Sequence, residues 1–253
     1  MRDGQRRARE AADKAIALGP ELPEGYIARA SMRAATQWDW EGARSDFQRA
    51  LTLAPENADA LTTYALYVLR SLGRLDEGIA VSRKAAQLDP LNGRIFSGLA
   101  SLLVGAGRLD EARAAAERSL EINPEQAFAP AWLGFVLLLQ GRPAEALAWY
   151  ARSTSEVFRL LGAAIVQHSL GHARESDAAL DELVRKHSHD AAYQIATVHA
   201  WRGDKDRAFE WLERARVQHD GGIALIKVDA AMRSLRDDPR YLELLAKLNL
   251  PRP

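Results

Sequence analysis

Apolar residues recur along most of this chain with the period of an α-helix. They lie three or four positions apart, and no stretch shows the sustained alternation of a half-buried β-strand. The two longest apolar runs, Ile95–Ala106 and Ala127–Leu139, fall short of the roughly 18 residues that a membrane span needs. The pattern therefore predicts an all-α protein that buries these runs in its own core, with no membrane insertion.

Prolines interrupt this pattern at a nearly constant interval. Pro20, Pro55, Pro90 and Pro124 are separated by 35, 35 and 34 residues, and each closes a similar apolar phrase. Proline has no N–H to donate and cannot continue a helix, so each of these residues is expected to end one. The spacing predicts an internal repeat of about 34 residues.

Glycine marks the middle of each repeat, about 17 residues before the expected closing point. It ends a helix in the left-handed conformation without steric cost, which predicts two helices per repeat. A small residue early in the second helix then lets the two helices approach closely. The glycines are Gly73, Gly107, Gly141, Gly171 and Gly203, and the small residues are Ala43, Ala112, Ala146 and Ala208.

This repeat resembles the tetratricopeptide repeat, a helix pair of 34 residues with leucine, glycine and an aromatic in the first helix, then alanine, an aromatic and proline in the second. The resemblance implies an all-α fold, a right-handed superhelix (α-solenoid) of about six helix pairs with a C-terminal capping helix. The best-matching residues are Phe96, Leu99, Ala100, Leu103, Ala112 and Pro124 in one repeat and Leu133, Gly134, Leu137, Ala146 and Tyr150 in the next.

We predict a repeat array over residues 1–228 and a C-terminal cap over residues 229–253. The array opens with a partial repeat, 5–20, which holds only a second helix, as a fragment of a longer array would. The full repeats are expected near 23–57, 58–92, 93–126, 127–156, 157–188 and 189–220.

The cap is expected to contain one last helix. Asp237 or Asp238 can cap its first turn, with Pro239 at the first helical position, and it should run to about Leu248. Leu242, Leu245 and Leu248 lie at helical spacing and are expected to cover the apolar face of the last repeat.

The run Thr36–Trp40 departs from the repeat, and we interpret it as an insertion in the turn between two helices. Two interpretations of Trp38 and Trp40 stay open: they cover the hairpin as buried side chains, or they form an exposed contact for a partner. Together with Ala192–Ala215, the Trp38–Trp40 run also resembles the C-terminal repeat region of bacterial multidomain signalling proteins. In that group, the repeats follow a nucleotide cyclase, a winged-helix regulator or a kinase domain.

Composition and motifs give no indication of catalysis. The net charge is zero, with 34 acidic and 34 basic side chains, so no overall field favours nucleic acid. The chain has no cysteine, which excludes disulfides and thiolate chemistry and fits a reducing compartment, so we expect a cytoplasmic protein. No phosphate-binding loop, nucleophile elbow or helical zinc motif occurs, and the turn with His187 and His189 lacks further ligands. We therefore predict no enzyme, cofactor or metal.

The resemblance implies a function in binding protein or peptide, because the first helices of the family line a concave groove. The interpretation is a scaffold or sensor arm of a bacterial signalling protein; the alternative is a regulatory fragment of an enzyme whose catalytic domain lies elsewhere. A homo-oligomer is left open. Phe135, Leu138 and Leu139 are either exposed in the groove or buried in the stack. Carried onto this sequence, the groove consists of Arg94, Ser101, Val104, Phe128, Ala131, Phe135, Leu138, Leu139, Ile165, His168, Thr197 and Trp201.

Overall fold

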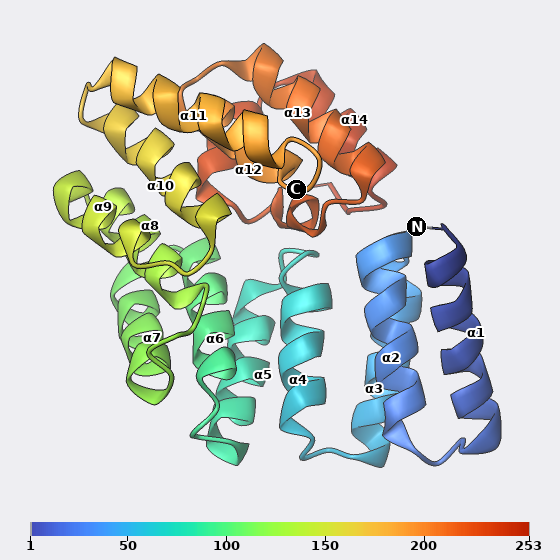
Figure 1. The fold of residues 1–253 in the computed structure, drawn as a ribbon. Helices are drawn as coiled ribbons and strands as arrows, with labels where there is room; N and C mark the ends of the chain where they lie inside the picture. Colours follow the sequence, from blue (N-terminus) through green and yellow to red (C-terminus); the bar gives the residue numbers. More distant parts are fainter. Residues whose placement is uncertain (1, 253) are drawn as a thin grey trace. The chain divides into compact units, whose positions relative to one another are not determined.

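The fold is all-helical, as the sequence predicts. The computed structural model describes residues 2–252, and within this range no residue lies in a strand. Six helix pairs follow one another along the chain, preceded by α1 and followed by α14 (Figure 1). The helices are α1 (Arg2–Leu18), α2 (Pro23–Met32), α3 (Trp40–Leu53), α4 (Ala58–Tyr64), α5 (Leu75–Leu88), α6 (Gly93–Gly105), α7 (Leu109–Ile122), α8 (Ala129–Leu139), α9 (Pro143–Ala151), α10 (Glu156–Ser169), α11 (Ala173–His187), α12 (Ala192–Trp201), α13 (Lys205–Gln218) and α14 (Pro239–Lys247).

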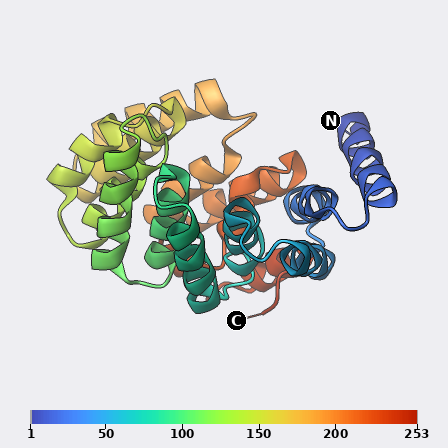
Figure 2. The same ribbon diagram turned by 90° about the horizontal axis from the view of Figure 1, so that it is seen from below.

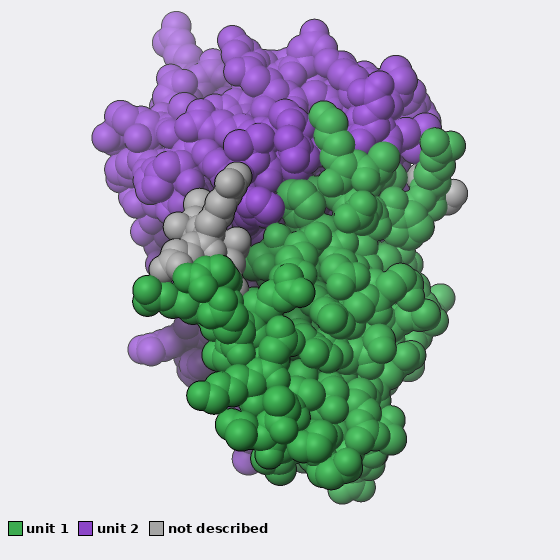
Figure 3. Space-filling view, turned by 90° about the vertical axis from the view of Figure 1, so that its right-hand side faces the viewer, with its two compact units in different colours: residues 1–90, 245–253 green, residues 91–244 purple. Residues whose placement is uncertain are grey.

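The chain divides into two compact units, which Figure 3 shows in different colours. The first comprises the residues up to Pro90 together with those from Leu245 onward, and the second comprises Leu91–Leu244. Helix α14 is shared, since its residues up to Leu244 belong to the second unit and the rest to the first. This boundary differs from the expected one between array and cap at residue 228, which stays a prediction.

In the first unit, neighbouring helices lie side by side with similar axis directions (Figures 1 and 2). Ala43 and Ala50, on one face of α3, are fully buried, so small residues at the contact let α2 and α3 approach closely, as expected. Phe47 lies between them and packs against the ring of Tyr64, with ring centroids 5.6 Å apart. Alanine contacts and this aromatic pair thus belong to the core of the unit, together with buried aliphatic side chains such as Leu69 and Ile79.

Glycine closes the hairpins in the way the sequence predicts. Gly107 has a φ of +73°, its N–H donates to Val104 O at 3.0 Å, and the N–H of Arg108 donates to Leu103 O at 2.9 Å. These two bonds form a Schellman motif, which satisfies carbonyls that the end of α6 leaves without helical partners. The other predicted glycines adopt the same left-handed conformation: Gly73, Gly141, Gly171 and Gly203.

The predicted insertion at Thr36–Trp40 is wrong. Trp38 lies 35 residues before Gly73, the same distance as between the first closing prolines, so the joint contains no additional residues. These repeats have 35 residues, one more than the usual 34. The additional residue lies inside the first helix, because a π-helical turn accommodates one extra residue. The two π-helical turns are η1 (Arg33–Gln37) and η2 (Ala65–Leu69).

After α13, the chain forms an element that the sequence analysis did not predict. Two 3₁₀ helices, η3 (Gly221–Leu225) and η4 (Ala230–Leu235), precede α14. An aspartate begins each of the three elements, and each aspartate accepts a hydrogen bond from the N–H two residues further on. Fully or almost fully buried apolar residues follow three and six positions later. The aspartates are Asp220, Asp229 and Asp238, and the apolar residues are Ile223 and Ile226, Met232 and Leu235, then Tyr241 and Leu244.

The last helix begins where the sequence predicts, at Pro239, with Asp238 accepting from the N–H of Arg240 at 3.0 Å. It ends at Lys247, one residue before the predicted end. Leu245 and Leu248 are buried as expected, and they belong to the first unit. Leu242 is 38% exposed, so its predicted covering role is wrong; Tyr241 and Leu244 are the buried residues on this part of the helix.

Candidate partner-binding groove

The first helices of the four pairs in the second unit form one continuous face. Helix α6 contacts α8, α8 contacts α10, and α10 contacts α12. Helix α8 is the most deeply embedded, since nine of its eleven residues are buried. All twelve predicted groove residues lie on these four helices or, for Phe128, at the residue that precedes α8.

Burial sorts the predicted groove residues into three groups. The largest group is buried and can contact a partner only through a small part of its surface. Leu139 and Trp201 are partly exposed, and Arg94, Phe128 and His168 are exposed. The buried residues are Ser101, Val104, Ala131, Phe135, Leu138, Ile165 and Thr197.

Phe135 lies in the middle of this face and packs against a helix two pairs away. Its ring centroid is 6.1 Å from that of Trp201, in an edge-to-face arrangement, and only 8% of the residue is exposed. The indole N–H of Trp201 donates to Ser169 Oγ at 2.9 Å, which holds the partner ring in place. Of the two interpretations left open by the sequence, these contacts favour burial for Phe135 and Leu138, whereas Leu139 retains exposed surface.

Phe128 immediately precedes α8, the helix that contains Phe135. Unlike Phe135, it is 49% exposed. Its ring packs edge-to-face against that of Phe158 near the start of α10, with centroids 5.5 Å apart. Edge-to-face aromatic pairs are favourable beyond their buried area, so each ring fixes the other. The result is a positioned aromatic pair at one end of the face, in which Phe128 is exposed and Phe158 is partly buried.

The α12 part of the face is covered by the segment Asp220–Leu235, which we call the strap. The strap holds Tyr193 at two points: Asp220 Oδ2 accepts from the backbone N–H of Tyr193, and Asp229 Oδ2 accepts from its hydroxyl, both at 2.9 Å. Burial raises the pKa of Asp229 above its ordinary value, and burial likewise raises the pKa of the Tyr193 hydroxyl. The clamp is therefore a partly buried polar contact between the strap and the inward side of α12.

Two further contacts extend the strap along α12. Ser234 Oγ donates to Ala200 O at 3.1 Å. Gly222 lies against the Tyr193 ring so closely that a Cβ there would be 2.7 Å from Tyr193 Cδ1. Thr197 and Ala200 are only 5% and 2% exposed. The strap therefore covers the inward side of α12, and its main contacts are with α12 and α13 rather than with α6, α8 or α10.

The strap residues were not among the predicted site residues, although the sequence contains a signal for them. The three aspartates lie nine residues apart, with large apolar residues three and six positions after each. This spacing does not fit the 3.6-residue period used to find the helices, because a 3₁₀ helix turns every three residues.

The histidines and carboxylates of the described residues do not gather into a metal site. Within residues 2–252, no group of three or more His, Cys, Asp or Glu side chains is placed to hold a metal ion. His187 instead forms contacts with two carboxylates, Glu156 Oε2 at 3.2 Å and Asp190 Oδ1 at 3.4 Å. Over the same residues, no helix combines the length and the apolar character that crossing a membrane requires.

Comparison with protein families identifies the repeat. One tetratricopeptide repeat model matches residues 69–128 and 103–157, and a second matches residues 31–93. Together they span residues 31–157, which is half of the chain. No curated protein matches the sequence.

Solved structures with similar folds cover most of the chain. PilW, a widely conserved type IV pilus biogenesis factor, superposes with a TM-score of 0.65 at 20% identity, over 77% of this chain and 90% of its own. The pilF protein of Pseudomonas aeruginosa gives 0.61 at 19% identity, over 79% and 90%. A chain of the APC/C hetero-tetramer Cut9–Hcn1 gives 0.66 at 14% identity, over 96% of this chain and 46% of its own. At these identities, the similarity establishes the fold.

Proposed function

Because the chain belongs to the tetratricopeptide repeat family, we propose that it is a non-catalytic module that binds a protein or peptide on the open face of α6, α8 and α10. Proteins with these repeats are generally protein–protein interaction modules. The observation that carries the proposal is the exposed Phe128, held by Phe158 at one end of this face. Exposed aromatic side chains on a rigid support are common anchors of protein interfaces.

The partner segment should be apolar where it meets Phe128. Arg94 and His168 are exposed near the two ends of the face, on α6 and α10, and add polar groups at its rim. An interface of this kind, with an apolar centre and a polar rim, buries little charge. Binding should consequently depend only weakly on salt, since few ion pairs would be screened.

A narrower proposal places the module in a bacterial signalling protein, as a scaffold or sensor arm. It is supported by the resemblance of the Ala192–Ala215 sequence, which supplies α12 and most of α13. The alternative, a regulatory fragment of a multidomain enzyme, predicts a catalytic domain in the same reading frame. Sequencing the reading frame around this chain distinguishes the two: a contiguous cyclase or kinase domain supports the alternative, and its absence supports the scaffold.

The test of the binding proposal starts from a partner captured with this chain and identified by mass spectrometry. Calorimetric titration then compares Phe128→Ala with the unaltered chain. We expect a loss on the order of 2 kcal/mol in binding free energy, the scale of an interface hot spot. Val217→Ala is the matched control, because Val217 is 62% exposed but lies on the second helix α13. Equal affinities for Phe128→Ala and the control would contradict the proposal.

A further inference from the structure

Trp38 holds an exceptional position among the joints of this fold. Five of the six helix pairs turn through a glycine in the left-handed conformation, and the first pair turns through Trp38, with a φ of +51°. A bulky side chain is rarely found there, because its Cβ crowds the following carbonyl. A residue kept in this conformation at a free-energy cost usually serves a contact elsewhere. For Trp38, this contact is with the C-terminal residues that cover Trp38 and Trp40.

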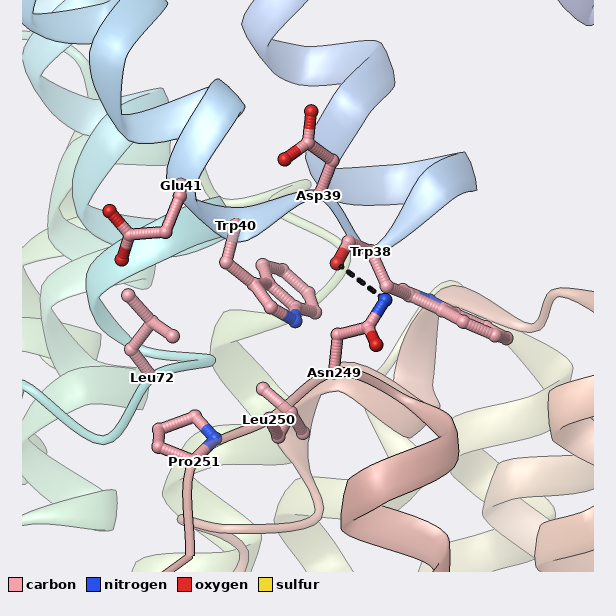
Figure 4. Close-up of a pocket in the computed structure, with 8 residues that line it drawn as sticks. All are labelled: Trp38, Asp39, Trp40, Glu41, Leu72, Asn249, Leu250 and Pro251. Carbon is pink, nitrogen blue, oxygen red and sulfur yellow. Dashed lines mark hydrogen bonds between the residues drawn. The ribbon is translucent and has the colours of Figure 1, made fainter.

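The C-terminal run Leu248–Pro251, which we call the tail, covers this turn (Figure 4). The indole N–H of Trp40 donates to Leu248 O at 2.8 Å, and Asn249 Nδ2 donates to Trp38 O at 3.4 Å. Trp38 and Trp40 are 8% and 4% exposed. Of the two interpretations left open by the sequence, burial is therefore correct, and the covering residues come from the other end of the chain.

The tail is held ready for this contact by its own hydrogen bonds. Leu250 N–H donates to Leu245 O at 2.9 Å and Asn249 N–H donates to Ala246 O at 3.1 Å, with Asn249 at a φ of +52°. This is a Schellman motif, with asparagine in the place that glycine usually takes. Because the motif fixes the tail locally, little conformational entropy remains to be lost when it docks.

The turn and the tail enclose one side of an open pocket of about 580 Å³. Glu41 and Leu72 line it together with the tryptophan turn and Asn249–Pro251, and Figure 4 shows Leu72 and Pro251 facing each other across it. Every residue that lines the pocket belongs to the first unit. The docking site is thus complete within that unit and open to solvent on one side.

The tail extends from a helix whose first residues, Pro239–Leu244, belong to the second unit. An element that packs on a unit other than the one it extends from is the kind that copies of a protein exchange in domain swapping. The hydrogen bonds to Leu248 O and from Asn249 are the same whether the tail belongs to the same chain or to another. We propose that the Trp38–Trp40 turn binds the tail of a second copy of this chain when its own tail has left it.

Complementary variants of the full chain test this site directly. The doubly substituted chain L248D/L250D keeps the turn but has no usable tail, and Trp40→Ala keeps the tail but lacks the indole that receives it. Neither variant should associate with itself. Mixed at about 100 μM each, they should form a 1:1 complex, detected as a doubled mass in analytical ultracentrifugation, because no tethered tail competes at millimolar effective concentration.

The control replaces L248D/L250D with Leu242→Asp, which alters an exposed residue of the same helix and leaves the tail on its own turn. This mixture should give no complex. Adding Trp40→Phe to L248D/L250D keeps a ring in the turn but removes the N–H donor, and should weaken the complex about fivefold, the effect of one hydrogen bond. Circular dichroism verifies that each variant is folded.

If Trp40→Ala does not fold, a synthetic peptide with the sequence of residues 239–252 replaces it. The peptide should then quench or shift the tryptophan fluorescence of L248D/L250D. Folded variants that show neither a complex nor peptide binding would overturn the proposal. An association that Trp40→Phe leaves unchanged would also overturn it, because the contact would then lie elsewhere.

Discussion

Helices α8 and α12 are both first helices of a repeat in the second unit, yet their inward sides have different environments. Next to α8, the Phe128 ring remains half exposed beside Phe158, whereas the inward side of α12 lies beneath the strap, with Tyr193 held by two aspartates. The repeat pattern determines which side chains point inward, but segments outside the repeat decide whether solvent reaches them. A groove inferred from repeat positions alone therefore overestimates the surface that a partner can use.

The largest expected effect comes from the middle of the face. Phe135→Ala removes a buried ring that packs against Trp201, and we expect the free energy of unfolding to fall by roughly 3–5 kcal/mol. Denaturant melts followed by circular dichroism measure this loss. Phe135→Leu, which retains much of the volume, should cost less. A melt unchanged by Phe135→Ala would place the ring in an open groove and weaken the contrast with Phe128.

Much of this fold follows from local residue chemistry that can be read from the sequence. The closing prolines and the glycines locate the ends of the helices, because few residues can replace either in its role. Ala43, Ala112, Ala146 and Ala208 are all fully buried, as the need for close helix contact predicts. The burial of Phe135 could not be decided in this way, because the ring of Trp201 that covers it comes from a helix 66 positions further along the chain.

The clamp between the strap and α12 should give the next largest effect. Tyr193→Phe removes the hydroxyl that donates to Asp229 Oδ2 and leaves a carboxylate oxygen without that donor. We expect a loss of about 1–2 kcal/mol in the free energy of unfolding, the usual cost of one unsatisfied polar group. Tyr67→Phe is the control, since Tyr67 is 43% exposed and should change stability by less than about 0.5 kcal/mol. Equal losses for the two variants would show that the clamp contributes nothing specific.

Asp229 and Asp238 begin successive elements and accept the same kind of backbone hydrogen bond. Their contributions to the free energy of unfolding should nevertheless change with pH in opposite directions. Burial raises the pKa of Asp229 above its ordinary value of 3.8, so the folded chain binds its proton more tightly than the unfolded chain does. Stability from this group is consequently present at acid pH and is lost as the pH rises from about 3.8 through the folded pKa. The variant Asp229→Asn lacks this titration and should gain stability relative to the unaltered chain over that rise.

Asp238 provides the matched comparison, since it begins the third Asp-capped element, nine residues after Asp229. Hydrogen bonds from Arg240 lower the pKa of Asp238 from 3.8 to about 2. Its contribution is present above pH 3.8 and is lost as the pH falls toward 2. Asp238→Asn should therefore lose stability relative to the unaltered chain as the pH rises from 2 to 4. Urea melts across pH 2–7 measure both differences in the free energy of unfolding. If the two differences changed with pH in the same direction, the pKa values of Asp229 and Asp238 would not be shifted in opposite directions.

The strap also shows where reasoning from sequence stops. Its apolar residues follow a nine-residue spacing within 3₁₀ helices, and aspartate is a common residue of turns in general. Only the position of Tyr193 beside Asp220 and Asp229 distinguishes the clamp from an ordinary turn, and that position depends on contacts between α12 and a segment 27 to 36 residues away. The burial of Trp38 could not be predicted from the sequence for the same reason, because its partner Asn249 lies 211 residues further along the chain.

The smallest effect on folding is expected at the residue with the largest proposed effect on binding. Phe128 is half exposed and precedes α8, so Phe128→Ala gives up its contact with Phe158 but opens no enclosed cavity. An aromatic pair contributes about 0.5–1.5 kcal/mol, and exposure of one ring places this pair at the low end. We expect the free energy of unfolding to change by about 0.5 kcal/mol, while binding of the captured partner weakens by on the order of 2 kcal/mol.

Phe135→Ala should show the reverse: a large loss of stability and unchanged affinity in the fraction that remains folded. Measuring melts and titrations on both variants separates an anchor from a core residue. A loss of stability at Phe128 comparable to that at Phe135 would mean that the open face and the buried middle form one core, and no anchor would remain at that end of α8.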